Sequence, residues 1–218
     1  MNDATLIVLA KAPVPGLVKT RLCPPCTPEQ AAAIARAAII DTLAAATATP
    51  RVRPVLVLDG APGPWVPAGL EVVPQTTGDL AQRLTGAFAS AGGPALLVGM
   101  DTPQVTPLTL RQAVDALLRP SVDAVLGRTL DGGWWTIGLR DAHLPAFIDV
   151  PMSTAHTGDR QATRLATLGL RVHDLAVEMD VDTYADARTV ANRVPTSEFA
   201  REVYAVARDL AAAISVDA

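Results

Sequence analysis

The stretch TLIVLAKAPVPGLVKTRLCPPCTPEQ, residues 5–30, indicates the fold class because it holds a strand, a loop and the start of a helix in succession. Residues 5–10 are short, apolar and partly β-branched, which is typical of the first strand of an α/β sheet. The sequence TPEQ at 27–30 is a capping box with proline at the first helical position, and it predicts a helix to about residue 46. A strand that leads through a loop into a helix is the repeating unit of α/β proteins.

The rest of the chain continues this alternation. Further strands are expected at residues 52–59, 70–75, 94–99, 123–129, 134–140 and 171–177, and further helices at 79–91, 106–118, 157–168 and from 183 onward. The strands at 123–129 and 134–140 flank a glycine-rich turn and should pair antiparallel. We therefore predict a Rossmann-like α/β fold with a mixed, mostly parallel sheet and helices on both faces. The chain should form one domain over residues 1–218, with a helical extension from about residue 183.

Composition and charge exclude some classes of partner. The chain has 22 acidic and 18 basic residues and a net charge of −4, which argues against a general nucleic-acid binder. Its apolar runs are too short for a membrane span, and its first residues lack a signal peptide's basic start, so we expect a cytoplasmic protein. Cys23 and Cys26 form a lone C-x-x-C motif without the further ligands of a zinc site. Neither the pairing of these thiols nor the oligomeric state follows from the sequence.

The first predicted strand leads directly into a basic loop. Lys11 and Lys19 are the only lysines in the chain, and the loop between them also holds Gly16 and continues into Thr20 and Arg21. Loops that follow strands lie at the carboxyl edge of the sheet, where open α/β folds bind ligands. Two ammonium groups, a guanidinium and the compact backbone of a glycine suit a polyphosphate. We expect phosphate binding here, with Lys19 as an exposed side chain that contributes little to the unliganded fold.

Aspartates follow two of the predicted strands. Asp101 comes directly after residues 94–99, and Asp180 and Asp182 follow residues 171–177. Carboxylates beside bound phosphates are the usual protein ligands of Mg²⁺ or Mn²⁺. We therefore expect a metal site made by Asp101 with either Asp182 or Asp180. The sequence leaves that choice open, and Asp182 could instead cap the helix that follows it.

A glycine-rich turn, DGGWW at 131–135, supplies a third set of candidates. Gly132 and Gly133 would let the backbone approach a ligand closely, and Trp134 could stack on a base or a sugar. Adjacent residues on a strand face opposite ways, so at least one of the two tryptophans should lie in the core. Asp131 could assist an acceptor.

Further polar residues are weaker candidates. Ser153 and Thr154 offer hydroxyl groups to an acceptor region, and Asp79 and Arg83 lie at the start of a predicted helix where they could meet phosphates. None of these residues carries a specific signal alone.

Several motifs together resemble those of a bacterial family of GT-A-like transferases of poorly defined function, sometimes found with radical-SAM and selenium-related domains. The motifs are AKAPVPGLVKTRL, GDLAQRLTGAF, VGMDTP, LDGGWWTIGL, MST and MDVDT, in this order, over nearly the whole chain to about residue 190. That family in turn resembles 2-phospholactate guanylyltransferase. The resemblance implies a nucleotide-diphosphosugar-transferase (GT-A) fold, with Asp101 and Asp182 as the metal pair and Lys19 and Arg21 at the phosphates.

The sequence departs from the family pattern in the region that should hold the acceptor. Trp134 and Trp135 stand where tyrosine is more usual, and Pro151 and Met152 precede Ser153 where tryptophan is common. The glycine-rich G-x-G-x-R opening of sugar nucleotidyltransferases is also absent. Neither the acceptor nor the base of the donor can therefore be transferred from the resemblance.

These observations favour a metal-dependent transferase with a nucleotide-activated donor and a small-molecule acceptor. Nucleotidyl transfer from a nucleoside triphosphate is the leading hypothesis, because a triphosphate needs more cationic groups than a sugar diphosphate does. Lys19 and Arg21 would then neutralise the leaving pyrophosphate. Glycosyl transfer from a nucleotide-sugar is the alternative, with Asp131 assisting the acceptor. A non-catalytic nucleotide-binding protein is a third hypothesis.

Overall fold

A seven-stranded sheet forms the centre of the protein. The structure is a computed structural model, and it describes residues 3–142 and 145–216. Its strands are β1 (Ala4–Lys11), β2 (Val52–Asp59), β3 (Glu71–Pro74), β4 (Ala95–Gly99), β5 (Ala124–Arg128), β6 (Trp134–Leu139) and β7 (Val172–Asp174). They lie in the order β3-β2-β1-β4-β6-β5-β7, and β6 is antiparallel to both of its neighbours whereas the other pairings are parallel. The predicted mixed, mostly parallel sheet is confirmed.

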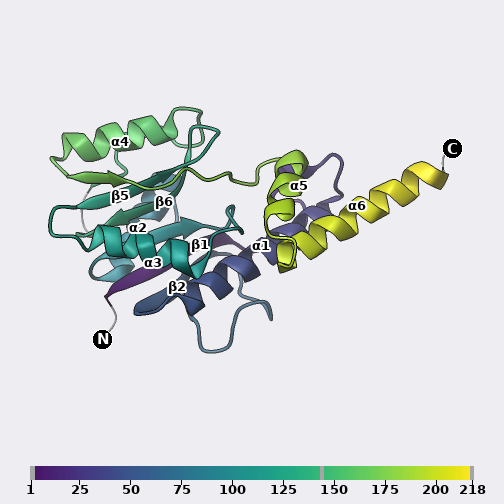
Figure 1. Cartoon of the computed structure of the whole chain (residues 1–218), viewed down its shortest axis with the longest axis horizontal. Helices are drawn as coiled ribbons and strands as arrows, with labels where there is room; N and C mark the ends of the chain where they lie inside the picture. Colours follow the sequence, from purple (N-terminus) through teal and green to yellow (C-terminus); the bar gives the residue numbers. More distant parts are fainter. Residues whose placement is uncertain (1–2, 143–144, 217–218) are drawn as a thin grey trace.

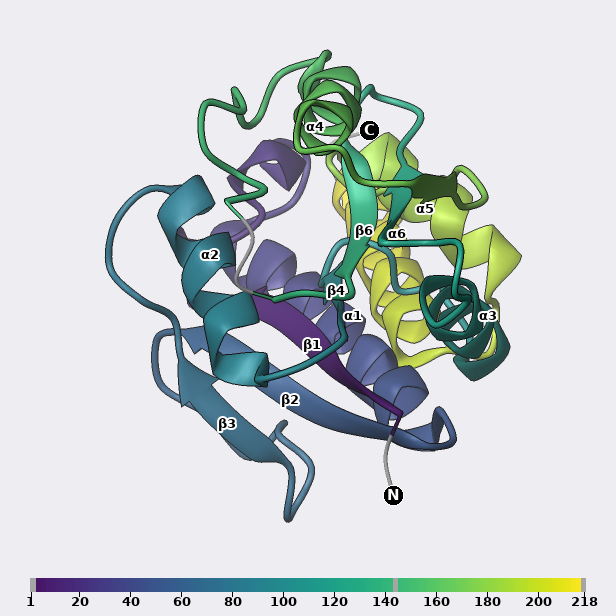
Figure 2. The same cartoon turned by 90° about the vertical axis from the view of Figure 1, so that its left-hand side faces the viewer.

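Helices cover both faces of this sheet (Figures 1 and 2). One face packs against α1 (Pro28–Ala48) and α3 (Pro107–Leu117), and the other against α2 (Leu80–Ala91) and α4 (Thr157–Thr167). The central strand β1 is apolar from residue 6 to residue 10 because it is buried on both faces: Leu6 and Val8 belong to the α1 side, and Ile7 to the α2 side.

Side-chain caps fix the starts of several helices where the sequence predicts them. Thr27 and Asp79 form capping boxes with residues three positions later, and Thr106 caps α3. At α5 (Tyr184–Arg193) the cap is Thr183, paired with Asp186. The alternative role of Asp182 as a helix cap is therefore wrong, and its carboxylate instead pairs with Arg21.

The C-terminal region packs on the outer face of α1. Here α5 and α6 (Glu198–Val216) form a third apolar cluster with α1, in which Ile34, Phe199 and Val203 are buried. The predicted helical extension from residue 183 thus divides into two helices, and Figure 1 shows α6 running away from the sheet. By length and apolar composition α1 is the one described helix that could cross a membrane, yet 61% of its most apolar window is buried inside this structure.

Strand directions bring four segments to one edge of the sheet. The carboxyl ends of β1, β4, β5 and β7 point the same way, and the turn into the antiparallel β6 lies there too. Four candidate segments therefore meet at this carboxyl edge: the basic loop, the loop that holds Asp101, the glycine-rich turn, and the segment that holds Asp180 and Asp182. This is the edge at which α/β sheets usually bind ligands.

Candidate active site

Two adjoining cavities lie at this edge. The first, here called the loop cavity, has a volume of about 360 Å³ and is lined by Lys11, Leu17, Val18, Lys19, Thr20, Arg21, Met100, Asp101, Ser153 and Asp182. The second, the aspartate cavity, has a volume of about 380 Å³ and is lined by Arg21, Thr129, Asp131, Gly133, Trp134, Ser153, Thr154, Ala155, Thr157, Asp180 and Asp182. Arg21, Ser153 and Asp182 belong to both cavities. The two cavities therefore share part of their lining.

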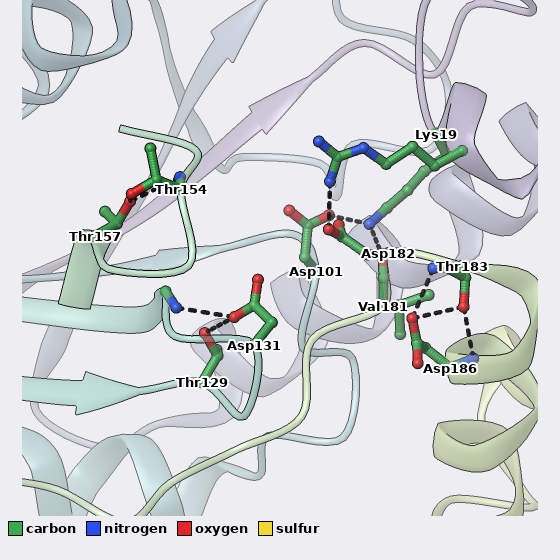
Figure 3. Close-up of polar contacts among 12 residues, drawn as sticks. Lys19, Asp101, Thr129, Asp131, Thr154, Thr157, Val181, Asp182, Thr183 and Asp186 are labelled. Carbon is green, nitrogen blue, oxygen red and sulfur yellow. Dashed lines mark hydrogen bonds and ion pairs between the residues drawn. The ribbon is translucent and has the colours of Figure 1, made fainter. Parts of the chain in front are cut away.

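Lys19 is held in place by both its backbone and its side chain. Its backbone is left-handed, with φ at 48°, and its side chain is only 9% exposed. The ammonium group lies 2.6 Å from an Asp101 carboxylate oxygen and donates a hydrogen bond to the carbonyl of Val181 (Figure 3). The expectation of an exposed loop lysine is therefore wrong. Lys19 instead connects the loop after β1 to the loop after β4 and to the segment that follows β7.

Arg21 forms a second ion pair between the basic loop and an aspartate of another segment. Its guanidinium lies 2.6 Å from Asp182, and its own side chain is 70% exposed. Lys11 is also exposed and lines the same cavity, while Gly16 makes the turn between the lysines with φ at 75°. The structure thus gathers the three cations of the loop around one cavity, and aspartates from other segments neutralise two of them.

The acidic segment at 178–182 is held from two sides. On one side the Val181 N–H donates to the Asp101 carbonyl at 2.8 Å, and the amide of Gln104 donates to the Met179 carbonyl and the Glu178 carboxylate. On the other side Glu178 pairs with Thr129, beside the glycine-rich turn. These contacts place Asp180 and Asp182 between Asp101 and Asp131. Gln104 is a residue that the sequence analysis missed, because a lone glutamine in a loop carries no pattern.

The glycine-rich turn positions Asp131 through its backbone. Asp131 Oδ1 accepts hydrogen bonds from the Thr129 hydroxyl at 2.5 Å and from the Gly133 N–H at 2.9 Å. Gly132 has φ at 91°, and a Cβ there would lie 1.9 Å from the Ala155 carbonyl oxygen. Its close approach is therefore to the segment that carries Ser153 and Thr154. In Figure 3 the second oxygen of Asp131 points into the space between Thr154 and Asp101.

The carboxylates present fit a divalent cation. Carboxylate oxygens of Asp131, Asp180 and Asp182 all lie within 4.8 Å of one another, and Asp182 also shares the loop cavity with Asp101. Burial and then the negative charges of Asp131 and Asp182 raise the pKa of Asp180 to about 6. Crowded carboxylates of this kind are the donor set that Mg²⁺ or Mn²⁺ prefers.

Other predicted residues lie outside the two cavities. Asp79 caps α2 and lines a separate cavity of about 610 Å³, and Arg83 binds Asp59 at 3.1 Å and the Gly78 carbonyl. Neither lines the loop cavity. Of the two tryptophans, Trp135 is in the core and Trp134 is half-buried at the aspartate cavity, as the alternation predicts.

The two cysteines lie beyond the basic loop and form no disulfide. Cys26 is buried in the cluster that contains α1 and α5, and burial followed by the nearby Cys23 raises the pKa of its thiol to about 11. A thiol of this kind stays protonated at neutral pH and is a poor nucleophile.

Comparison with known sequences assigns the chain to a family. Residues 35–154 match the family described as "Uncharacterized protein conserved in bacteria (DUF2064)". The chain belongs to this family. The match spans the α1-to-β6 part of the fold and the segment that holds Ser153 and Thr154. No curated protein sequence matches the chain significantly.

Several solved structures share the fold of this DUF2064 protein. A "putative nucleotide-diphospho-sugar transferase" from Desulfovibrio desulfuricans G20 is 24% identical over 97% of this chain and 96% of that one, with a TM-score of 0.84. CMP:2-keto-3-deoxy-manno-octonic acid synthetase, solved with CTP, is 12% identical over 88% and 98%, with a TM-score of 0.60. Rv0371c of Mycobacterium tuberculosis H37Rv, solved with manganese, is 24% identical over 87% and 98%, with a TM-score of 0.50. At these identities the likeness establishes the shared fold.

Proposed function

We propose that this DUF2064 protein is a Mg²⁺- or Mn²⁺-dependent transferase that binds a nucleoside triphosphate in the loop cavity. It would transfer the nucleotidyl group to a small acceptor in the aspartate cavity. The observation that carries this proposal is that three cations of one loop, Lys11, Lys19 and Arg21, line a single cavity together with Asp101 and Asp182. Cations suit the donor's phosphates, and the carboxylates suit its metal ion.

The ion pairs at the loop cavity indicate how the site would accept its donor. Asp101 and Asp182 would hold the cation, which supplies charge neutralisation at the donor phosphates. Lys19 and Arg21, at present paired with these carboxylates, would then donate to phosphate oxygens and stabilise the leaving pyrophosphate. The aspartates hold the two cations at the loop cavity, and each cation would exchange its aspartate for a phosphate oxygen when the donor binds.

Proteins that share the fold support the choice of donor and metal. One of them was solved with CTP and another with manganese. The same fold also includes a protein described as a nucleotide-sugar transferase, so the fold is compatible with either type of transfer.

Glycosyl transfer from a nucleotide-sugar is a second candidate, and one observation favours it. Asp131 has one oxygen held by Thr129 and Gly133 and the other directed into the aspartate cavity, which suits removal of a proton from an acceptor hydroxyl. A nucleotide-sugar offers only two phosphates to the three cations of the loop, which is why we place this reaction second.

A thermal-shift titration with nucleoside triphosphates, diphosphates and nucleotide-sugars of each base, with and without Mg²⁺, tests the proposal. A ligand at a hundred times its Kd stabilises by about 2.7 kcal/mol. We expect triphosphates with Mg²⁺ to stabilise most, and pyrophosphate to be the product of turnover. If a nucleotide-sugar stabilises more and a nucleoside diphosphate is released, glycosyl transfer replaces nucleotidyl transfer. If no nucleotide stabilises the protein, both functions are rejected.

A further inference from the structure

We propose that Cys23 and Cys26 are a redox modification site: they form a reversible disulfide, and its formation displaces the neighbouring segment that lines the loop cavity. The pairing of the thiols and the displacement are independent of the proposed function. Only the resulting change in nucleotide affinity rests on it.

The two cysteines lie on one hydrogen-bonded turn. The Cys26 N–H donates to the Leu22 carbonyl at 3.0 Å, and the Cys23 N–H donates to the Thr20 carbonyl at 3.1 Å. Only two residues separate the cysteines, and the chain has no other cysteine. Burial and then the charge of Cys23 raise the pKa of Cys26, so the two thiols interact. A C-x-x-C pair in a turn is an arrangement that forms disulfides in redox-active proteins.

The two thiols differ in accessibility, which sets the order of the reaction. Cys26 is 5% exposed and belongs to the third apolar cluster, with α1 and α5, whereas Cys23 is half-buried at the edge of that cluster. Cys23 is therefore the thiol that a dissolved oxidant reaches first.

A low-molecular-weight disulfide such as oxidised glutathione serves as the oxidant. The Cys23 thiolate attacks one sulfur of that disulfide, forms a mixed disulfide and releases one glutathione thiolate. Cys26 then loses its proton to water, bonds to the Cys23 sulfur and releases the second glutathione. The two cysteines lose two electrons, and the glutathione disulfide gains them.

The turn connects a fixed end to a less firmly held one. Cys26 directly precedes Thr27, the cap of α1, and its side chain is packed in the apolar cluster. Cys23 directly follows the short 3-10 helix η1 (Thr20–Leu22). The two sulfurs are not bonded in this structure, so formation of the bond has to draw them together. Because Cys26 is held by its packing, the movement falls on Cys23 and on η1.

The helix η1 carries two residues of the loop cavity, Thr20 and Arg21. The Arg21 side chain is 70% exposed and is held by its ion pair with Asp182. An exposed ion pair contributes little to stability, so it opposes a displacement only weakly. Oxidation of the cysteines therefore moves Arg21 away from the position in which it lines the cavity.

The full chain, reduced with dithiothreitol or treated with oxidised glutathione, tests this inference. The readouts are intact mass, hydrogen exchange of residues 17–22, and calorimetric Kd values for ATP, GTP, CTP and UTP with Mg²⁺. We expect the loss of two hydrogen atoms, reversed by dithiothreitol, and exchange that is at least about threefold faster in the oxidised form. The nucleotide that binds the reduced form should bind the oxidised form at least about fivefold more weakly.

Two single variants are the controls. Cys23→Ser and Cys26→Ala each keep one thiol, so neither can form the internal disulfide. After the same treatment their exchange and nucleotide Kd should match those of their reduced forms. They distinguish the internal disulfide from simple attachment of glutathione, which adds mass to a single thiol.

The outcomes separate this inference from the proposed function. An unchanged mass, or the mass of attached glutathione alone, overturns the disulfide. A disulfide without faster exchange in residues 17–22 overturns its coupling to the loop cavity, and faster exchange with an unchanged nucleotide Kd overturns the effect on the donor site. If no nucleotide binds the reduced wild type, the proposed function is rejected, while mass and exchange still decide whether the cysteines are a redox site.

Discussion

The contact between Lys19 and Asp101 joins the two kinds of residue on which the proposed site depends. The sequence predicts both residues, because the only two lysines share one loop and Asp101 follows a buried strand. It does not predict that they touch, since the contact depends on β1 and β4 being neighbours. Nor does it predict the left-handed backbone that turns Lys19 inward.

Replacement of Lys19 by alanine should affect both stability and binding. Its side chain is 9% exposed and its ammonium group contacts Asp101 and the Val181 carbonyl, so we expect Lys19→Ala to lower the free energy of unfolding by about 1 kcal/mol. Nucleotide affinity should fall at least about tenfold. Urea unfolding and calorimetry measure the two effects.

Lys11→Ala is the matched control from the same loop. Lys11 is exposed, so this variant should bind nucleotide more weakly while its stability stays within about 0.5 kcal/mol of the wild type. Equal stability of both variants would contradict the constrained position of Lys19.

At the scale of elements, the sequence predicts features that depend on a few neighbouring residues, and it misses contacts between segments that are distant in the chain. Capping boxes at Thr27 and Asp79 and the antiparallel pair around the glycine-rich turn are encoded within a few residues, and the structure confirms them. The insertion of β6 between β4 and β5 is not local, and neither is the contact between that turn and residue 155. For this reason the sequence suggested that Gly132 approaches a ligand, whereas its tight contact is with another part of the chain.

A single methyl group at Gly132 should disturb the aspartate cavity. Gly132→Ala would place a Cβ 1.9 Å from the Ala155 carbonyl oxygen at a backbone with φ at 91°. We expect a loss of about 3 kcal/mol in the free energy of unfolding, measured with urea. Gly169→Ala provides the control, because its φ is 73° but a Cβ there meets nothing within 4 Å. That variant should lose only about 1 kcal/mol, the cost of the left-handed backbone. Similar losses in both would show that the contact with residue 155 has no energetic role.

At the scale of the whole molecule, the topology of the sheet accounts for the site. Parallel strands and one antiparallel insertion bring the carboxyl ends of β1, β4, β5 and β7 to one edge, so Arg21 and Asp182, which are 161 positions apart, form an ion pair. We propose that residues 1–218 fold as one domain, because α1 packs against the sheet on one side and against α5 and α6 on the other. The sequence predicted this fold class from strand and helix alternation, but the packing of two C-terminal helices on α1 required the structure.

Calorimetry of nucleoside triphosphate binding, with and without Mg²⁺, in the wild type and in Asp101→Asn tests the central claim most directly. Asparagine keeps the size of the side chain but removes the charge that a hard cation requires. Asp159→Asn is the control for loss of an exposed aspartate elsewhere. We predict that Mg²⁺ tightens binding at least about tenfold in the wild type and the control, and less than about twofold in Asp101→Asn. The same dependence on Mg²⁺ in all three proteins would contradict a metal-assisted nucleotide site at the carboxyl edge.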